Sequence, residues 1–204
     1  MTYRIEVTPR EGYLTEAAES VLGRIHDLGI GTVQAVGVSR LFFVDGDLND
    51  DAVQHLTAEV LADDVIETFA ITRDTAASTS GDGHTRSIEI SCKPGVTDTV
   101  AEVLEESARQ LGIGGVERTA TATRYTIAGD VSDVQLQRIA RGVLANEVVE
   151  QWAIDSMIEP PFPENMPVGT EVTQIPIRGA DEDGLLQISK VRSLSLNLEE
   201  MEAI

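Results

Sequence analysis

The sequence is short of cysteine, aromatic residues and positive charge, and each shortage has a consequence. Its single cysteine, Cys92, rules out a disulfide within the chain and any metal site made of several cysteines. Aromatic residues account for 4% of the 204 residues, so the core must be built from valine, isoleucine, leucine and alanine. The 35 acidic residues outnumber the 15 basic ones and give a net charge of −20, which argues against binding to nucleic acid or an anionic membrane surface.

Long apolar runs are missing as well. No stretch approaches the roughly 18 to 20 consecutive apolar residues that a membrane-spanning helix needs, and residues 1–6 lack the apolar core of a secretion signal. A lone cysteine is typical of a reducing compartment. Together these features predict a cytoplasmic protein that does not bind membranes.

Two copies of one pattern fill most of the chain. A shift of 83 residues aligns residues 5–71 with 88–154 without a gap, and 21 of the 67 aligned positions are identical. The matches include Leu28–Gly31 with Leu111–Gly114. A gapless match of this length predicts the duplication of one folding unit.

Each copy has the hydrophobic periodicity of a β-α-β-β-α-β unit, the split βαβ order of ferredoxin-like folds. In the first copy the expected elements are a strand, a helix that ends at Gly29, two strands joined near Gly37–Arg40, a second helix capped by Asn49 or Asp50, and a short strand. They occupy residues 3–8, 14–28, 32–44, 50–61 and 67–71. The second copy repeats them at residues 88–91, 100–111, 116–127, 136–144 and 150–154. We therefore expect an α+β protein with two ferredoxin-like units in tandem.

Composition suggests the division of the chain. We expect a first unit at residues 1–73, a flexible linker of small and polar residues at 74–85, a second unit at 86–155 and an extended proline-rich linker at 156–204. Beyond the prolines we expect a weak helix near residues 183–192. Asn197 and Glu200 have the spacing of a capping box, yet the sequence ends at Ile204, which suggests a fragment of a longer polypeptide.

Residues with reactive side chains show no catalytic spacing. His26, His55 and His84 are scattered; His26 and His55 are expected on the surface of helices, and His84 lies in the linker with no residue to pair with it. Cys92 has only Lys93 as a nearby basic residue to lower its pKa, so we expect a small residue at the end of a strand rather than a nucleophile.

Two loops resemble ligand-binding motifs but depart from them. Residues 45–51 begin like a calcium loop, but Asp50 stands where glycine is required and Leu56 where glutamate is required. Glycines 29, 31, 112, 114 and 115 follow helices, whereas a phosphate-binding loop precedes one. The sequence therefore predicts no catalytic, cofactor-binding or metal-binding residue in this chain.

The second copy opens with a motif that resembles a known family. Residues 92–98 read Cys-Lys-Pro-Gly-Val-Thr-Asp, and a helix and Leu111-Gly112 follow. This is similar to the K-x-G-V-x-D and L-G pattern of the PurS family, the small component of phosphoribosylformylglycinamidine (FGAM) synthase. The first copy keeps Arg10 and Gly12 but lacks the aspartate. Residues 194–204 resemble the segment that leads into the synthetase body of the large, single-chain enzyme.

This resemblance implies a specific role. Two fused units would form a pseudo-dimer in place of a PurS dimer, and the isolated chain would be a monomer. The family's enzyme is an ATP-dependent amidotransferase that makes FGAM from formylglycinamide ribonucleotide (FGAR), ATP and glutamine. ATP and magnesium are expected in the rest of the enzyme and not in this chain. The implied partners are the synthetase body and the glutaminase part, on the same or another polypeptide.

A second interpretation stays open at this point. Tandem ACT-type regulatory modules have the same order of elements and bind an amino acid between paired units. Such a module needs a ligand-binding loop after the first strand of each unit, and the loops at that position here are residues 9–13 and 93–96.

Overall fold

The computed structural model describes residues 1–13, 16–73, 85–162, 175 and 177–203. Residues 1–164 form one compact body and residues 165–204 form a second. The predicted 74–85 linker lies outside the described residues except for its last residue, and so does most of the proline-rich stretch. The predicted domain boundaries stay predictions.

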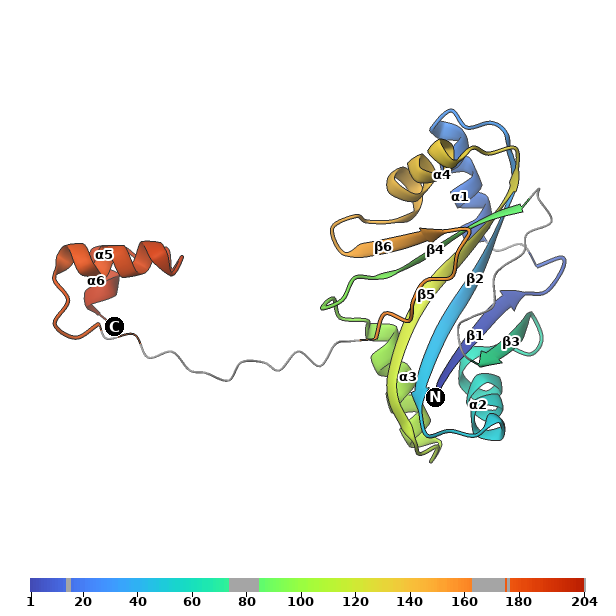
Figure 1. Ribbon diagram of the computed structural model, residues 1–204, viewed down its shortest axis with the longest axis horizontal. Helices are drawn as coiled ribbons and strands as arrows, with labels where there is room; N and C mark the ends of the chain where they lie inside the picture. Colours follow the sequence, from blue (N-terminus) through green and yellow to red (C-terminus); the bar gives the residue numbers. More distant parts are fainter. Residues whose placement is uncertain (14–15, 74–84, 163–174, 176, 204) are drawn as a thin grey trace. The chain divides into compact units, whose positions relative to one another are not determined.

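The larger body contains one antiparallel sheet with strand order β3-β1-β2-β5-β4-β6 (Figure 1). The first repeat contributes β1 (Thr2–Pro9), α1 (Glu16–Asp27), β2 (Val33–Gly46), α2 (Asp50–Leu56), a π-helical turn η1 (Thr57–Leu61) and β3 (Glu67–Arg73). The second contributes β4 (Thr85–Cys92), α3 (Thr99–Gln110), β5 (Val116–Gly129), α4 (Asp133–Ile139), the turn η2 (Ala140–Leu144) and β6 (Glu150–Ile154).

A pseudo-two-fold axis relates the two repeats at the centre of this sheet. β2 and β5 pair antiparallel, and Arg40 lies opposite Thr123 in their ladder. These two residues occupy equivalent positions of the repeats, because the 83-residue shift converts one into the other. The ladder is therefore centred on this pair, and each repeat supplies one three-stranded half. The predicted α+β class and tandem pseudo-dimer are confirmed.

Equivalent glycines stand at the two ends of the β2–β5 ladder. Gly46 and Gly129 have φ angles of 150° and 140°. A Cβ atom on Gly46 would lie 1.9 Å from the carbonyl oxygen of Gly115, and one on Gly129 would lie 2.3 Å from that of Thr32. Thr32 and Gly115 are themselves equivalent, so each repeat passes close to the backbone of the other at the same place.

The expected break near Gly37–Arg40 is absent, because β2 runs unbroken from Val33 to Gly46. The glycine that suggested a turn serves close packing instead: a Cβ atom on Gly37 would lie 2.3 Å from the Thr126 hydroxyl oxygen of β5. β5 is equally long. The second and third strands expected in each repeat are thus two halves of one strand.

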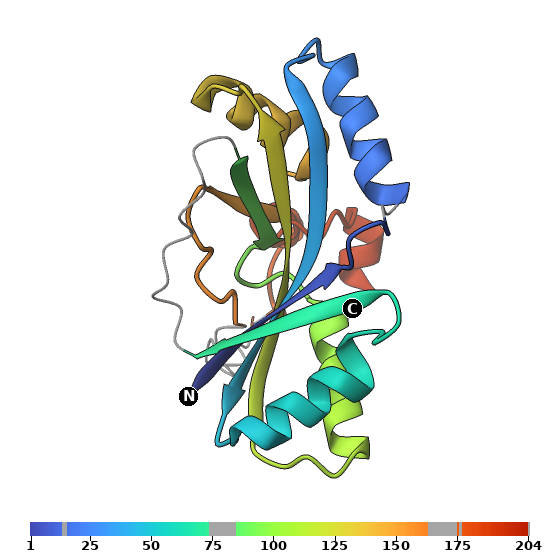
Figure 2. The same cartoon turned by 90° about the vertical axis from the view of Figure 1, so that its right-hand side faces the viewer.

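Helices cover one face of the sheet in two pairs, and each pair combines both repeats (Figure 2). Ile25 of α1 and Ile139 of α4 belong to a core cluster that includes Ile88 and Ile127 of the strands. Leu56 of α2 and Leu104 of α3 belong to a second cluster. Its other fully buried members include Tyr3 and Ile5 of β1 and Val44 of β2. Because every helix pair needs residues of both repeats, neither repeat has a complete core alone.

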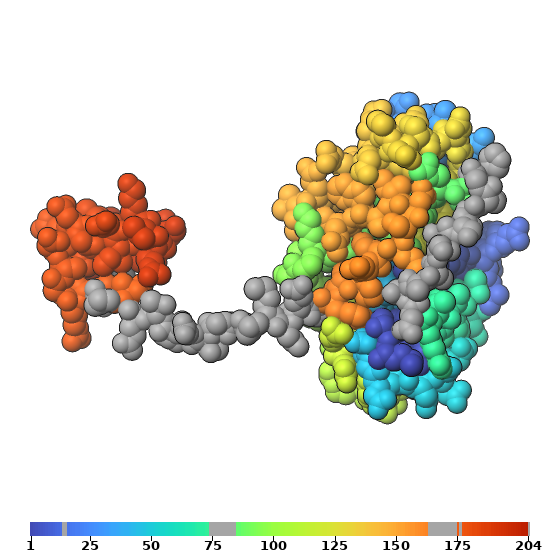
Figure 3. All heavy atoms as spheres, viewed as in Figure 1, coloured from blue at the N-terminus to red at the C-terminus, as the bar shows by residue number. Residues whose placement is uncertain are grey.

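The opposite face carries a third apolar cluster, which the chain covers with the segment that follows β6. Leu41, Phe43, Ala120 and Ala122 form its floor, and Ile158 packs on them. We call residues 155–162 the covering segment; Figure 3 shows it (orange) running across the body. Phe162 lies partly buried on the same cluster, with its ring centre 4.6 Å from the Arg118 guanidinium carbon.

The second body holds two short helices, α5 (Glu182–Val191) and α6 (Leu198–Glu202). The Ser189 hydroxyl donates to the Leu196 carbonyl (2.8 Å) and accepts from its N–H (3.0 Å), which closes the loop between them. Asn197 and Glu200 form the predicted capping box. The predicted weak helix is confirmed as α5.

Candidate functional site

The loop that carries the PurS-like motif, residues 93–98, is held by contacts within the chain. The Lys93 ammonium donates to the carbonyl oxygens of Glu147 and Val148, and the Lys93 N–H donates to Val149 (2.9 Å). Gly95 takes a φ of 85°, which favours glycine. The motif lysine therefore anchors the turn before β6.

The motif aspartate joins a helix to the sheet. One Asp98 carboxylate oxygen accepts from the Ala101 N–H (3.0 Å) and caps α3. The other accepts from the Thr121 N–H (2.7 Å) and hydroxyl (2.8 Å). Glu105, two turns along α3, accepts in the same way from the Thr119 N–H (3.2 Å) and hydroxyl (3.0 Å). These two carboxylates thus satisfy the part of β5 that pairs with no strand on the β4 side.

Two cavities lie at equivalent places in the repeats. The second-repeat cavity has a volume of about 200 Å³ and is lined by the motif loop, α3, Thr119 and Pro161. The first-repeat cavity is larger, about 510 Å³, and lies between residues 6–13 and β2, with Arg124 and Thr126 of β5 on its wall. The loops on which the ACT-type interpretation depended line these two cavities.

A cluster of four charged side chains lies on the face that the helices leave open. Arg4 donates to both Glu89 carboxylate oxygens (3.1 and 2.6 Å). Arg124 donates to Glu6 (3.1 Å) and lies 3.9 Å from Glu89. The Ile158 N–H of the covering segment donates to Glu89 (2.9 Å). We call Arg4, Glu6, Glu89 and Arg124 the charge cluster; the two carboxylates are equivalent positions of the repeats.

The histidines and the cysteine are engaged elsewhere, exposed, or outside the described residues. The His26 ring lies 3.0 Å from the Val33 carbonyl oxygen, His55 is exposed on α2, and His84 falls outside the described part of the chain. Burial, with the charges of Asp98 and Glu150, raises the pKa of the Cys92 thiol. A raised pKa leaves less thiolate, which supports the interpretation of Cys92 as a structural residue.

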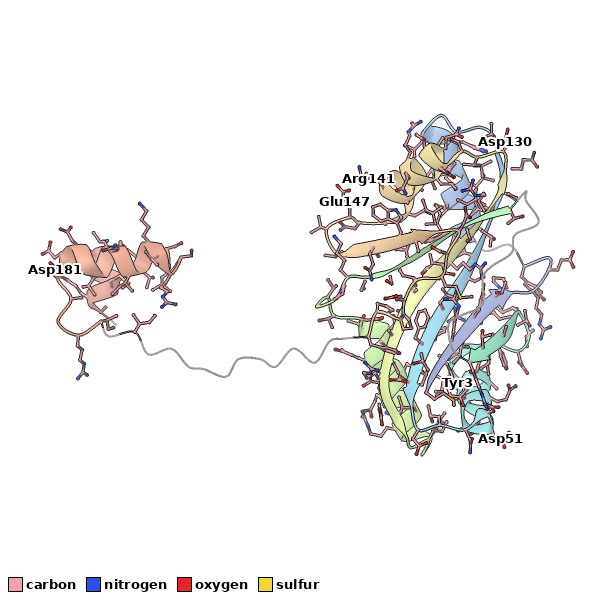
Figure 4. All side chains as sticks on the ribbon, viewed as in Figure 1. Tyr3, Asp51, Asp130, Arg141, Glu147 and Asp181 are labelled. Atoms are coloured by element: carbon pink, nitrogen blue, oxygen red, sulfur yellow. The ribbon has the colours of Figure 1, made fainter. Side chains whose placement is uncertain are left out.

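The loop that resembled a calcium site is tied to its own surroundings. A hydrogen bond from Arg118, helped by the Thr2 hydroxyl and the amino terminus, lowers the pKa of Asp45 to about 2 although burial opposes it. Asp50 accepts from the Tyr3 hydroxyl (3.1 Å) and pairs with Arg73; Figure 4 shows Tyr3 beside α2. Asn49 caps α2 as predicted.

Within the described ranges, no group of three or more histidine, cysteine, aspartate or glutamate side chains is arranged to hold a metal ion. Nor is any described helix long and apolar enough to cross a membrane.

Sequence reasoning missed the charge cluster and the cavities. Arg4 and Glu6 alternate with buried residues of β1, and the alternation alone places them only on the opposite face of the strand from Ile5 and Val7. Their burial depends on the neighbouring strands and on the covering segment, so periodicity within one strand carries no signal for it.

Comparison with known families bears on both repeats. The family model described as PurS, phosphoribosylformylglycinamidine (FGAM) synthase, matches residues 2–75 and 85–157. These ranges contain β1 to β3 and β4 to β6. The match favours the PurS resemblance over the ACT-type interpretation. No curated protein matches the chain.

Proposed function

The chain belongs to the PurS family of FGAM synthase in purine biosynthesis, and we propose that it is the scaffold that docks the glutaminase part of that enzyme onto its synthetase part. In this role it carries no catalytic residue. Glutamine hydrolysis on one partner supplies ammonia, and the other partner uses ATP to convert FGAR to FGAM. The scaffold holds the glutaminase site and the synthetase site in a fixed position relative to each other.

The observation that carries the proposal is the agreement between the family match and the sheet. Both matched ranges fold as equivalent halves of one sheet, paired through β2 and β5 about Arg40 and Thr123. One chain therefore supplies what two separate PurS-type units would supply together. Covalent linkage holds the halves at an effective concentration of about millimolar or above, so the scaffold does not depend on protein concentration.

The chemistry of ammonia explains why a scaffold is needed. Ammonia that escapes into water is protonated and diluted, so the two sites must be joined along a path from which bulk water is excluded. A rigid body that contacts both partners can fix that path.

The test compares two nitrogen sources. FGAM formation by the remaining FGAM synthase components is measured with glutamine and with ammonium chloride, each with and without this chain. We expect glutamine-driven synthesis to need the chain and ammonia-driven synthesis to change less than about twofold. Equal glutamine-driven rates with and without the chain would contradict the proposal.

A further inference from the structure

In the second repeat, part of the long strand β5 has no neighbouring strand on the β4 side, and its backbone N–H groups find hydrogen-bond acceptors elsewhere. Thr119 and Thr121 of β5 turn their N–H groups away from β2, and the carboxylates of Glu105 and Asp98 accept them. Backbone N–H groups that are buried need an acceptor of this kind. Two carboxylates of the chain itself therefore occupy this edge.

The equivalent edge in the first repeat has lost both carboxylates. Val36 and Val38 of β2 correspond to Thr119 and Thr121, and by the same alternation their N–H groups point away from β5. The last ladder pair between β1 and β2 is Val7 with Arg40, and beyond it the printed contact between the two strands is that of the Thr8 and Ser39 hydroxyls (3.0 Å). Pro9, the last residue of β1, has no N–H with which to continue the ladder opposite Val38. The residues that correspond to Glu105 and Asp98 are Leu22 and Thr15, neither of which has a carboxylate.

This edge lines the first-repeat cavity, whose volume of about 510 Å³ falls within the usual range for small-molecule sites. Its wall also contains both signs of charge. Arg124 is 15% exposed and donates to Glu6 (3.1 Å), while its buried Nε makes no hydrogen bond among the described atoms and lies 3.9 Å from Glu89. The Glu6 carboxylate lies beside it and is 25% exposed. A guanidinium donor next to backbone N–H groups suits a carboxylate, and Glu6 suits an ammonium group.

We propose that the first-repeat cavity binds a free α-amino acid. Its carboxylate takes the place held in the second repeat by the carboxylates of Asp98 and Glu105, and accepts hydrogen bonds from the Val38 N–H and from Arg124. Its ammonium group lies against Glu6. The Ser39 and Thr8 hydroxyls, which lie 3.0 Å apart on the same wall, are available to its polar atoms.

Binding at this site lets the concentration of a free amino acid change the stability of the scaffold. Both repeats contribute to it, since β1 and β2 come from the first and Arg124 from the second. A bound amino acid therefore adds contacts across the β2–β5 pairing.

Titration calorimetry on the intact chain tests the proposal with defined probes: L-glutamine, L-glutamate, L-aspartate and, as a carboxylate without an ammonium group, succinate. We expect saturable binding of at least one amino acid and at least about tenfold weaker binding of succinate, a difference of about 1.4 kcal/mol. The double variant Glu6→Gln with Arg124→Gln removes both charges together and should weaken amino-acid binding by at least about tenfold. Arg118→Gln, an arginine outside this cavity, is the matched control and should leave it unchanged.

A variant that keeps the charge cluster gives a second measurement. Val38→Pro removes one N–H from the cavity side of β2 and none from the β5 ladder, so circular dichroism should report an intact fold while binding weakens. Absence of binding by all three amino acids at about 10 mM, equal binding of succinate, or full binding by the double variant would overturn the inference. The calorimetry uses this chain alone, so its outcome is independent of the test of the scaffold proposal.

Discussion

Arg4 of β1 and Glu89 of β4 form a bidentate ion pair across β2 and β5, the two strands that separate them in the sheet. The side chains are 3% and 1% exposed, and the Arg4 guanidinium lies 5.5 Å from the centre of the Phe43 ring. Small residues on β5, Ala120 and Ala122, are buried on the same face and leave room for the long side chain. The pair joins the two repeats directly.

Removal of one partner of this pair leaves a buried charge without compensation. We expect Glu89→Ala to destabilise the chain by about 3 to 5 kcal/mol, measured by urea denaturation. The double variant Arg4→Met with Glu89→Met removes both charges and should be considerably more stable than Glu89→Ala. If the single and double variants lose the same stability, the ion pair is not the cause.

The close approach at Gly46 predicts a strong effect of a small substitution. Because a Cβ atom there would lie 1.9 Å from the Gly115 carbonyl oxygen at a positive φ, Gly46→Ala should cost at least about 1 to 3 kcal/mol of unfolding free energy. Gly31 has no atom within 4 Å of its Cβ position, so Gly31→Ala is the control. It should be neutral or stabilising by up to about 1 kcal/mol. Equal thermal midpoints for the two variants would refute the packing argument.

The lowered pKa of Asp45 should make the stability of the fold depend on pH in the acid range. Its pKa of about 2 in the folded chain lies below the ordinary value of 3.8, so its charged form favours the folded state. That contribution is complete above about pH 5 and is lost as the pH falls through 3.8 towards 2. Asp45→Asn should remove about 1 to 2 kcal/mol at pH 7 and little at pH 2. Chemical denaturation at both pH values measures the difference, and a loss that is independent of pH would exclude this explanation.

Substitutions in the covering segment should lower the stability of the chain but leave the two apolar clusters under the helices intact. Ile158 packs on Leu41 and Phe43 and is 6% exposed. Ile158→Ala should therefore lower the free energy of unfolding by about 2 to 3 kcal/mol. Ile158→Pro also removes the N–H that donates to Glu89 and should cost more. Hydrogen exchange should quicken in β2 and β5 before the helices. Unchanged exchange in these strands would show that the segment contributes little.

Local patterns predicted the repeats and most helix boundaries, because these depend on residues close in the sequence. Asn49 and Asn197 cap helices where their spacing indicated, and Gly29 follows α1 with a φ of 79°. The 83-residue shift also anticipated equivalent halves of the sheet.

Features that depend on distant residues were missed. Gly37 suggested a turn, but it lies inside β2, where a Cβ atom would meet the hydroxyl oxygen of Thr126, far along the chain. The π-helical turns η1 and η2 follow α2 and α4 without a break, and no residue pattern distinguished them from continued α-helix. The Arg4–Glu89 pair likewise joins residues that only the β2–β5 ladder brings together.

The open sheet face has a consequence for how many partners it can accept. Leu41 and Arg124 are equivalent positions, yet one belongs to the apolar floor and the other to the charge cluster. A dimer of identical chains repeats every side chain about its axis and offers a partner two indistinguishable orientations. The fused repeats differ in sequence, and among the described residues the covering segment lies on this face after β6. A protein that docks across this axis therefore meets a surface with a defined polarity, in one orientation and with a stoichiometry of one per chain.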